Sequence, residues 1–432
     1  MTVTIDGTVG ANKGVVLDSN GKLPAIDGSQ VTALSATQIT TGTVATARLD
    51  TGTTAGKVLV LDGSGNMPAI DGSLMTGIAS ATKSASNPTI STNPSTGLGT
   101  KWINTTTGDV YVLTDATAGA NVWTNSGAGT GDIQLWLWQG TQYGIVAGGY
   151  QNPPSTRVNN IQKISFTSDG NATDQGDLTS GRNSPGAGKG PSYGYVAGGS
   201  TGSYVNTIDR YLLATMANAV DVGDLTHVWS PHGGAGSSTH GYVCGGYSTL
   251  REDSIEKWAY AASSNATDVG NLTRARSNGS TQTSTTHGYS AGGYDSGAPN
   301  NQWDIIDKWA FATDGNATDV GDLVVATEGP GGCSSSTHGY ASGGKQVGAP
   351  VVTTIQKFAF ASDGNASNVG NLSAARYNTG QHCSSLTYGY HHGGYTGSSS
   401  DVIDKWAFAS DGTASDIGNL VLPVSDGPGI GY

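Results

Sequence analysis

Residues 239–272 decide the fold, because close copies of them recur through the last two-thirds of the chain. They begin Thr239-His240-Gly241-Tyr242-Val243-Cys244-Gly245-Gly246-Tyr247, continue Ser254-Ile255-Glu256-Lys257-Trp258-Ala259-Tyr260, and end Asn265-Ala266-Thr267-Asp268-Val269-Gly270-Asn271-Leu272. At this position of the repeat a Gly-Gly pair recurs six times, starting at residues 148, 198, 245, 292, 343 and 393, at intervals of 50, 47, 47, 51 and 50 residues. A period near 50 that carries strand-like segments is typical of a β-propeller.

Each repeat supplies enough strands for one blade. The first is the Gly-Gly strand, the second an Ile-x-Lys-aromatic strand, and the third a short strand ending Val/Ile-Gly-Asn/Asp-Leu. A Ser/Thr-rich segment before the next Gly-Gly pair supplies the fourth, and four strands make one blade. The last repeat stops early and the first begins late, so we expect residues 427–432 to complete the blade that begins near residue 142. This closure would leave no open sheet edge.

Repeated positions have readable structural roles. Asp-Gly at 169–170, 314–315, 363–364 and 411–412 predicts a hairpin between the second and third strands. Gly-Gly predicts a close approach of neighbouring backbones. We expect one bulky position in each repeat to fill the gap between neighbouring blades, and its occupants are Ile164, Tyr211, Trp258, Trp309, Phe358 and Trp406.

The N-terminal third has a different pattern. Leu17–Ser29 recurs as Leu61–Ser73, a shift of 44 residues, and both copies contain Ala-Ile-Asp-Gly-Ser. Such short apolar clusters cannot be buried within one chain, so we predict a homotrimeric fibrous stalk over residues 1–78. Residues 79–97 are predicted to be a linker, and residues 98–131 a small β module around Val110–Leu113. The six-bladed propeller then occupies residues 132–432, with seven blades as the alternative if residues 97–130 contribute one.

Composition agrees with an all-β chain and excludes several classes of protein. The 432 residues include 67 glycines, only 12% are charged, and the net charge is −12. No basic patch is present, which argues against nucleic acid as a partner. No apolar stretch of about 18 residues occurs, so we expect no membrane insertion. The start of the chain lacks a secretory signal, and three cysteines do not form a disulfide framework. We therefore expect synthesis in a reducing cytoplasm.

Two resemblances follow from these motifs. The six Gly-Gly strands with downstream aromatic strands resemble a kelch-type propeller. The Ala25–Ser29 and Ala69–Ser73 motifs, Gly42–Leu49 and Lys101–Tyr111 are similar to segments of tail fibres of tailed bacteriophages, including phages of marine bacteria. This resemblance implies a structural protein of the virion tail, made in the host cytoplasm. It further implies an N-terminus that binds other tail or baseplate proteins, and a propeller that binds a polysaccharide or protein receptor on the host.

Candidate binding residues lie in the irregular loops, since loops on a rigid scaffold often carry recognition. Aromatic faces beside Asn, Asp and Ser suit sugar rings, and the candidates are Tyr150, Tyr247, Tyr294, Trp303 and Tyr395. Three other patterns have structural explanations. His240, His287 and His338 share one repeat position, which favours hydrogen-bonded strand starts over a metal site. The Ser-Asp-Gly-Asn-Ala-Thr-Asp motif lacks the distal Glu of a calcium loop. The basic position predicts solvated or inter-blade ion pairs, and its members are Lys163, Arg210, Lys257, Lys308, Lys357 and Lys405.

No catalytic, cofactor or metal site is predicted, although zinc at His391 and His392 is an open alternative. The leading interpretation is a non-enzymatic virion fibre that binds the host surface. The alternatives are a glycan-degrading enzyme of the tailspike type and a structural adaptor or decoration protein within the virion.

Overall fold

The computed structural model describes Ser19 and residues 81–126, 136–231, 233–295, 302–346, 350–377 and 380–432. The chain divides into two compact units, residues 1–133 and 134–432. Apart from Ser19, the predicted stalk over residues 1–78 lies outside the described residues, so the trimeric stalk stays a prediction. The described ranges are all-β and contain no helix, and hence no helix long and apolar enough to cross a membrane.

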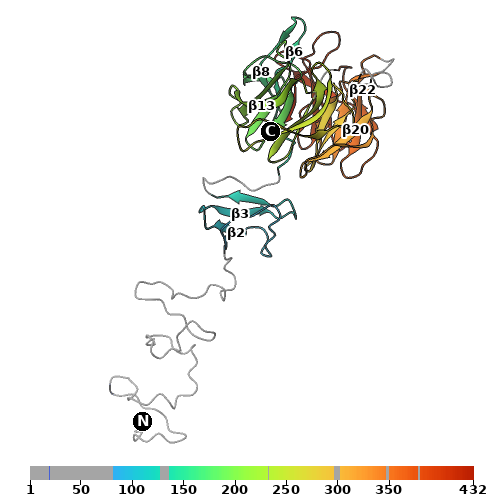
Figure 1. Ribbon diagram of the computed structural model, residues 1–432. Coiled ribbons are helices and arrows are strands. Elements are labelled where there is room, and N and C mark those ends of the chain that lie inside the picture. The colour runs from blue at the N-terminus through green and yellow to red at the C-terminus, as the bar shows by residue number, and fades with distance from the viewer. Residues whose placement is uncertain are drawn as a thin grey trace. The chain divides into compact units, whose positions relative to one another are not determined.

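The described part of the first unit is a four-stranded sheet, in which β2 and β3 are labelled in Figure 1. Its strands are, in sheet order, β1 (Thr82–Ser84), β2 (Lys101–Asn104), β3 (Val110–Asp115) and β4 (Val122–Asn125). β1 pairs in parallel with β2, and the Trp102 indole donates a hydrogen bond to the Ser86 carbonyl at 2.9 Å. The small β module therefore extends into residues 79–97, which we predicted to be a linker.

The described residues of the second unit form six main sheets, numbered here from one to six in chain order. Sheet one has β31 (Gly429–Gly431), β5 (Tyr143–Ala147), β8 (Asn160–Ser165) and β9 (Thr173–Asp177). Sheet two has β10 (Gly186–Lys189), β11 (Tyr193–Ala197), β12 (Val205–Leu212) and β13 (Val220–Trp229). Sheet three has β14 (Gly234–Gly236), β15 (His240–Tyr247), β16 (Arg251–Ala259) and β17 (Thr267–Asn271).

The remaining three sheets repeat this plan. Sheet four has β18 (Ser280–Thr283), β19 (His287–Ala291), β20 (Ile305–Ala310) and β21 (Thr318–Asp322). Sheet five has β23 (Gly331–Ser334), β24 (His338–Ser342), β26 (Thr354–Ala359) and β27 (Ser367–Asn371). Sheet six has β28 (Tyr388–His392), β29 (Val402–Ala407) and β30 (Ser415–Asn419). Two short ribbons pair β6 (Tyr150–Gln151) with β7 (Thr156–Arg157), and β22 (Thr327–Glu328) with β25 (Lys345–Gln346).

The predicted order of strands within a repeat is confirmed. In sheets two to five, the strand before the Gly-Gly strand forms one edge and the strand that carries Val-Gly-Asn/Asp forms the other. The first glycine of each pair has φ between 53° and 70°, and the second between 98° and 126°. A Cβ on Gly343 would lie 2.5 Å from the Arg376 carbonyl oxygen. Both the close approach and the positive φ require glycine here.

The C-terminal strand joins the first repeat, as predicted. β31 pairs antiparallel with β5, and Gly429 lies opposite Val146. The segment 380–385 then links sheet five to sheet one, because Gly332 N donates to the Gly380 carbonyl and Gly429 N donates to the Gln381 carbonyl, both at 2.8 Å. The edge strands that pair with the Gly-Gly strands also contact one another across neighbouring sheets. β10 contacts both β14 and β31, β14 contacts β18, and β18 contacts β23.

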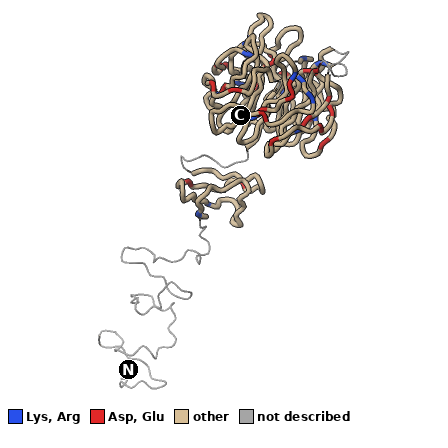
Figure 2. Tube along the Cα trace, viewed as in Figure 1, with Lys and Arg blue, Asp and Glu red and all other residues tan. Residues whose placement is uncertain are grey.

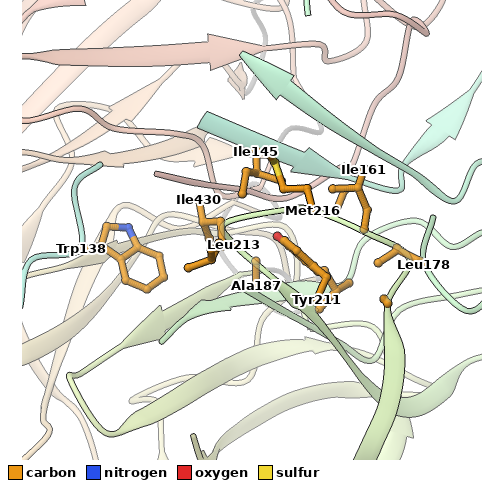
Figure 3. Close-up of a cluster of buried hydrophobic side chains, with 12 residues drawn as sticks. Trp138, Ile145, Ile161, Leu178, Ala187, Tyr211, Leu213, Met216 and Ile430 are labelled. Atoms are coloured by element: carbon orange, nitrogen blue, oxygen red, sulfur yellow. The ribbon is translucent and has the colours of Figure 1, made fainter. Parts of the chain in front are cut away.

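Six apolar clusters lie between consecutive sheets, and one of them joins sheet six to sheet one. Figure 3 shows the cluster in which Ile145 and Ile161 of sheet one pack with Ala187 and Tyr211 of sheet two. The other five use the predicted bulky position in the same way, and its occupants there are Ile164, Trp258, Trp309, Phe358 and Trp406. The five aromatic occupants each cross a glycine on the paired Gly-Gly strand, and a Cβ on Gly241 would lie 2.3 Å from the Trp258 ring.

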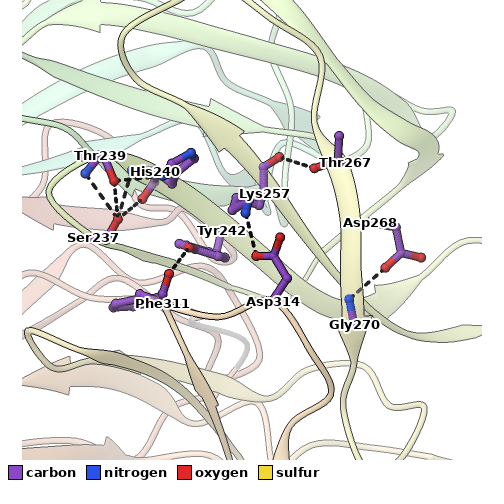
Figure 4. A network of polar contacts seen from close by, with 10 residues as sticks. All are labelled: Ser237, Thr239, His240, Tyr242, Lys257, Thr267, Asp268, Gly270, Phe311 and Asp314. Carbon is purple, nitrogen blue, oxygen red and sulfur yellow. Dashed lines mark hydrogen bonds and ion pairs between the residues drawn. The ribbon is translucent and has the colours of Figure 1, made fainter.

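Polar clamps repeat at the same boundaries. The turn residue Asn316 of sheet four accepts a hydrogen bond from Asn271 N of sheet three at 3.1 Å, and Asn171 of sheet one accepts one from Asn419 N of sheet six at 3.0 Å. Lys257 of sheet three pairs with Asp314 of the next turn at 2.6 Å, as Figure 4 shows. The Asp-Gly turns are therefore hairpins, as predicted, and they also fasten neighbouring sheets together.

Candidate functional site

Four of the five predicted binding residues share one structural position. Each lies directly after its Gly-Gly pair and forms a β-bridge with the segment that leaves the preceding sheet or, for Tyr150, with the C-terminal segment. The bridges are Tyr150↔Ser425, Tyr247↔Ser230, Tyr294↔Ser277 and Tyr395↔Tyr377. We call this edge of the sheets the Gly-Gly end. Trp303 lies beside it, since Trp303 N donates to the Gly293 carbonyl at 2.9 Å.

Arginine side chains accompany these aromatic rings. The Arg251 guanidinium carbon lies 4.5 Å from the Tyr294 ring centre and 5.7 Å from the Tyr247 ring centre, so one arginine brings two predicted residues together. Arg157 lies 5.7 Å from the Tyr150 ring centre, and Arg274 lies 5.6 Å from that of Trp303. Such contacts are cation–π interactions. We did not select these arginines from the sequence, although Arg251 and Arg157 stand in the loops that we singled out.

Tyr395 differs from the other candidates, because its neighbour is a second aromatic ring. Tyr377 meets it edge to face with ring centres 5.7 Å apart. Tyr247 is 38% exposed and also meets Tyr204 of sheet two at 6.0 Å, while the other four candidates are half-buried. Rings held in this way can stack on a sugar or a planar group without much loss of side-chain entropy.

The opposite edge of the sheets carries the histidine and lysine positions. Thr239, Thr286 and Thr337 hydroxyls each lie 2.8 Å from Nδ1 of the following histidine, which confirms the predicted hydrogen-bonded strand starts. Burial lowers the pKa of His240, His287 and His338. The lowered pKa favours the neutral imidazole, whose hydrogen bond with the threonine hydroxyl holds the turn.

The basic position makes ion pairs between sheets in four of its six occurrences. Lys257, Lys308 and Lys357 reach Asp314, Asp363 and Asp411 at 2.6, 2.5 and 2.9 Å, and Lys405 reaches Asp169 of sheet one. The acid therefore comes from the next turn and not from the neighbour in sequence, since Asp307 binds Arg276 instead. Lys163 and Arg210 have cation–π contacts with Tyr143 and Tyr193, at 5.1 and 4.5 Å. Figure 2 marks the charged residues along the chain.

A compact cluster of His382, His391 and His392 occupies the junction of sheets five, six and one. The His382 ring centre lies 4.1 Å from that of His391 and 4.2 Å from that of His392. Burial lowers the pKa of His392 to about 3 and holds those of His382 and His391 well below their usual range, with further lowering by the neighbouring imidazoles and Arg376. Within the described ranges, no group of three or more His, Cys, Asp or Glu side chains is arranged to hold a metal ion.

Other perturbed groups are enclosed in the packing. Burial lowers the pKa of Lys189 to about 7, and its ammonium donates to the carbonyls of Leu137 and Gln139 at 2.9 and 2.8 Å. The buried lysine therefore anchors the segment that enters sheet one. Burial raises the pKa of the Cys244 and Cys333 thiols to about 12. Thiols in this state are poor nucleophiles.

No family model matches this sequence, and no curated protein is similar enough to count as a relative.

Proposed function

We propose that residues 136–432 form a closed six-bladed β-propeller of kelch-like design. The observation that supports this most strongly is the repetition of one set of contacts at all six boundaries. A backbone N–H in each turn donates to the last strand of the preceding sheet, from Ala172, Ala219, Ala266, Ala317, Ala366 and Ala414. The first of these reaches Asn419 of sheet six at 2.8 Å, so the series returns to its start. A closed ring protects the edges of its sheets.

We further propose that the protein is a tail fibre of a bacteriophage and that the Gly-Gly end binds the host surface. The observation that carries this proposal is the set of tyrosine–arginine contacts on a rigid repeated scaffold, at loops whose sequences differ between repeats. An N-terminal trimeric stalk would attach the fibre to the tail and present three propellers. Three linked propellers would strengthen individually weak contacts through avidity.

Attachment to bacteria tests this function. Fluorescently labelled full-length protein is incubated with a panel of bacterial strains that includes marine isolates, and cell-bound fluorescence is measured. We expect saturable binding to some strains. The double variant Tyr247→Ala/Tyr294→Ala should reduce it at least tenfold, because both rings lie against Arg251.

The matched control is Leu386→Ala, which removes a side chain 48% exposed in the turn before Tyr388, at the opposite edge of sheet six. This variant should bind like the wild type. Equal binding by the double variant and the wild type would contradict the proposed surface. Oligosaccharide released from the cells would favour the glycan-degrading alternative.

A further inference from the structure

An open pocket of about 260 Å³ lies between sheets two and three, at the edge opposite the Gly-Gly end. Its lining includes Gly190, Ser192, Tyr193, Tyr195, Thr239 and Tyr260. The Tyr195 and Tyr260 rings are stacked with centres 4.9 Å apart, while Ser192 and Thr239 are exposed. Aromatic walls with hydroxyl groups at the rim suit a small polar ring. The volume is below the usual 300–1,000 Å³ of sites for drug-sized ligands, so one sugar residue is a suitable size.

The pocket lies at one of the two turns that lack the serine found in the other four. Four other turns begin with a serine, and its hydroxyl accepts hydrogen bonds from the backbone two and three residues later, as Ser237 does from Thr239 N and His240 N at 3.2 and 3.0 Å. The other three serines are Ser284, Ser335 and Ser385. Gly190 replaces the serine here, and a Cβ on it would lie 3.1 Å from the Tyr260 ring. The fold therefore accepts serine at this position elsewhere, and glycine opens the space.

A second departure leaves a cation beside the same pocket. The equivalents of Arg210 in sheets three to six pair with an aspartate of the next turn. Ser263 stands where those turns have aspartate, and no described acidic side chain forms an ion pair with Arg210. The guanidinium lies 4.5 Å from the Tyr193 ring centre, and Arg210 is opposite Tyr195 in the strand register. Its charge is therefore available to an anion at the rim.

We propose that this pocket binds a sugar residue that carries a carboxylate, such as a uronic acid in an acidic surface polysaccharide. Arg210 would pair with the carboxylate, since guanidinium groups bind carboxylates in a planar, two-point manner. The Tyr193 and Tyr260 rings would contact the sugar face, and Ser192 and Thr239 would bond its hydroxyls. The inference deepens the proposed host-surface function by naming a ligand class, and places a second site away from the tyrosine–arginine contacts.

Ligand-observed NMR with full-length protein tests the site, using sodium glucuronate, glucose and sodium acetate as probes. We expect saturable glucuronate binding and at least tenfold weaker binding of glucose and acetate. Arg210→Gln should weaken glucuronate binding at least tenfold. Ser263→Asp should do the same while keeping the arginine, because it restores the ion pair found at four other boundaries. Gly190→Ser should fill the pocket and also abolish binding.

The control is Lys308→Gln, which removes the 2.5 Å ion pair with Asp363. This ion pair joins sheets four and five, whereas the pocket lies between sheets two and three. It should bind glucuronate like the wild type, and thermal unfolding should show that all variants are folded. Failure of wild-type protein to bind glucuronate, equal binding of acetate, or unchanged binding by both Arg210→Gln and Ser263→Asp would overturn the proposal. If the protein attaches to cells but does not bind glucuronate, the proposed sugar site is wrong and the host-surface function stands. If it binds glucuronate but attaches to no cells, the host-surface function is wrong and the sugar site stands.

Discussion

Single residues vary in coordinated pairs at the boundaries between sheets. Arg182, Arg276 and Arg376 each pair with a fully buried aspartate of the next sheet, and the aspartates are Asp209, Asp307 and Asp404. At the other three boundaries the arginine position holds Trp229, Thr327 or Val424, and the acid position holds Glu256, Gln356 or Gln162. Arginine therefore occurs only opposite aspartate, as expected if a buried charge needs its partner.

Breaking one of these pairs should destabilise the fold strongly. Asp307 accepts hydrogen bonds from Arg276 and from Thr273 N at 2.9 and 3.0 Å, with both ionic side chains fully buried. Arg276→Thr leaves the carboxylate without its cation and should cost about 3–5 kcal/mol. The free energy of unfolding in urea measures this loss.

The neutral boundary between sheets four and five provides the matched variant. Arg276→Thr/Asp307→Gln copies Thr327 and Gln356, where Gln356 Oε1 accepts a hydrogen bond from Val324 N at 2.7 Å. The double variant should recover more than half of the stability lost by the single one. A double variant as unstable as Arg276→Thr would show that the pair does not act as a unit.

The bulky side chain at each boundary should matter as much as the ion pairs. Trp309 is 3% exposed and packs between sheets three and four. Trp309→Ala should cost about 3–5 kcal/mol by removing this ring and leaving a cavity. Trp309→Phe copies the boundary of Phe358 and should cost less than half as much, as measured by urea unfolding. Equal losses for both variants would mean that ring volume is not what stabilises the boundary.

At the scale of whole elements, the strand β28 and the segment before it hold three buried histidines that should make stability depend on pH. An unfolded histidine has a pKa near 6.5, whereas burial lowers that of His392 to about 3. Between these values the unfolded chain binds protons that the folded chain does not. Stability should therefore fall as the pH drops from about 6.5 towards 3, by up to about 1.4 kcal/mol per pH unit for each such imidazole.

Unfolding in urea at pH 7.5, 6 and 5 measures this slope. His392→Gln removes one buried imidazole and should make the slope shallower. His287→Gln, at a half-buried turn position, should change it less. An identical slope for wild type and His392→Gln would contradict the account of this cluster.

The strands and their order could be predicted from the sequence because the repeat marks each of them. Gly-Gly, Asp-Gly and the bulky position all have local causes, and residues 427–432 could be assigned to sheet one because the first repeat lacks a strand. Arg276 and Asp307 were not recognised as partners, since their contact joins two repeats. The pocket at Gly190 was missed for the same reason: its walls belong to two sheets. β1 was missed because its three residues, Thr82–Ser84, have no repeat or apolar alternation.

At the scale of the molecule, we propose a closed ring of six sheets whose surfaces differ from boundary to boundary. The repeated contacts explain how a chain with 67 glycines and only 12% charged residues can keep one structure. The departures from the repeat, at Gly190 and Ser263 and in the loops of the Gly-Gly end, are where we place recognition. Both proposed surfaces depend on the contacts between neighbouring sheets, because each surface joins residues of two sheets.

Cryo-electron microscopy of the full-length protein tests the ring most directly. We predict a map with six sheets around one axis, in which β31 completes the sheet of β5 and Phe166 stacks on Tyr390 of sheet six. The two rings should lie with their centres near 4.6 Å apart. A map with a gap between sheet six and sheet one, or with a number of sheets other than six in the ring, would contradict the central claim.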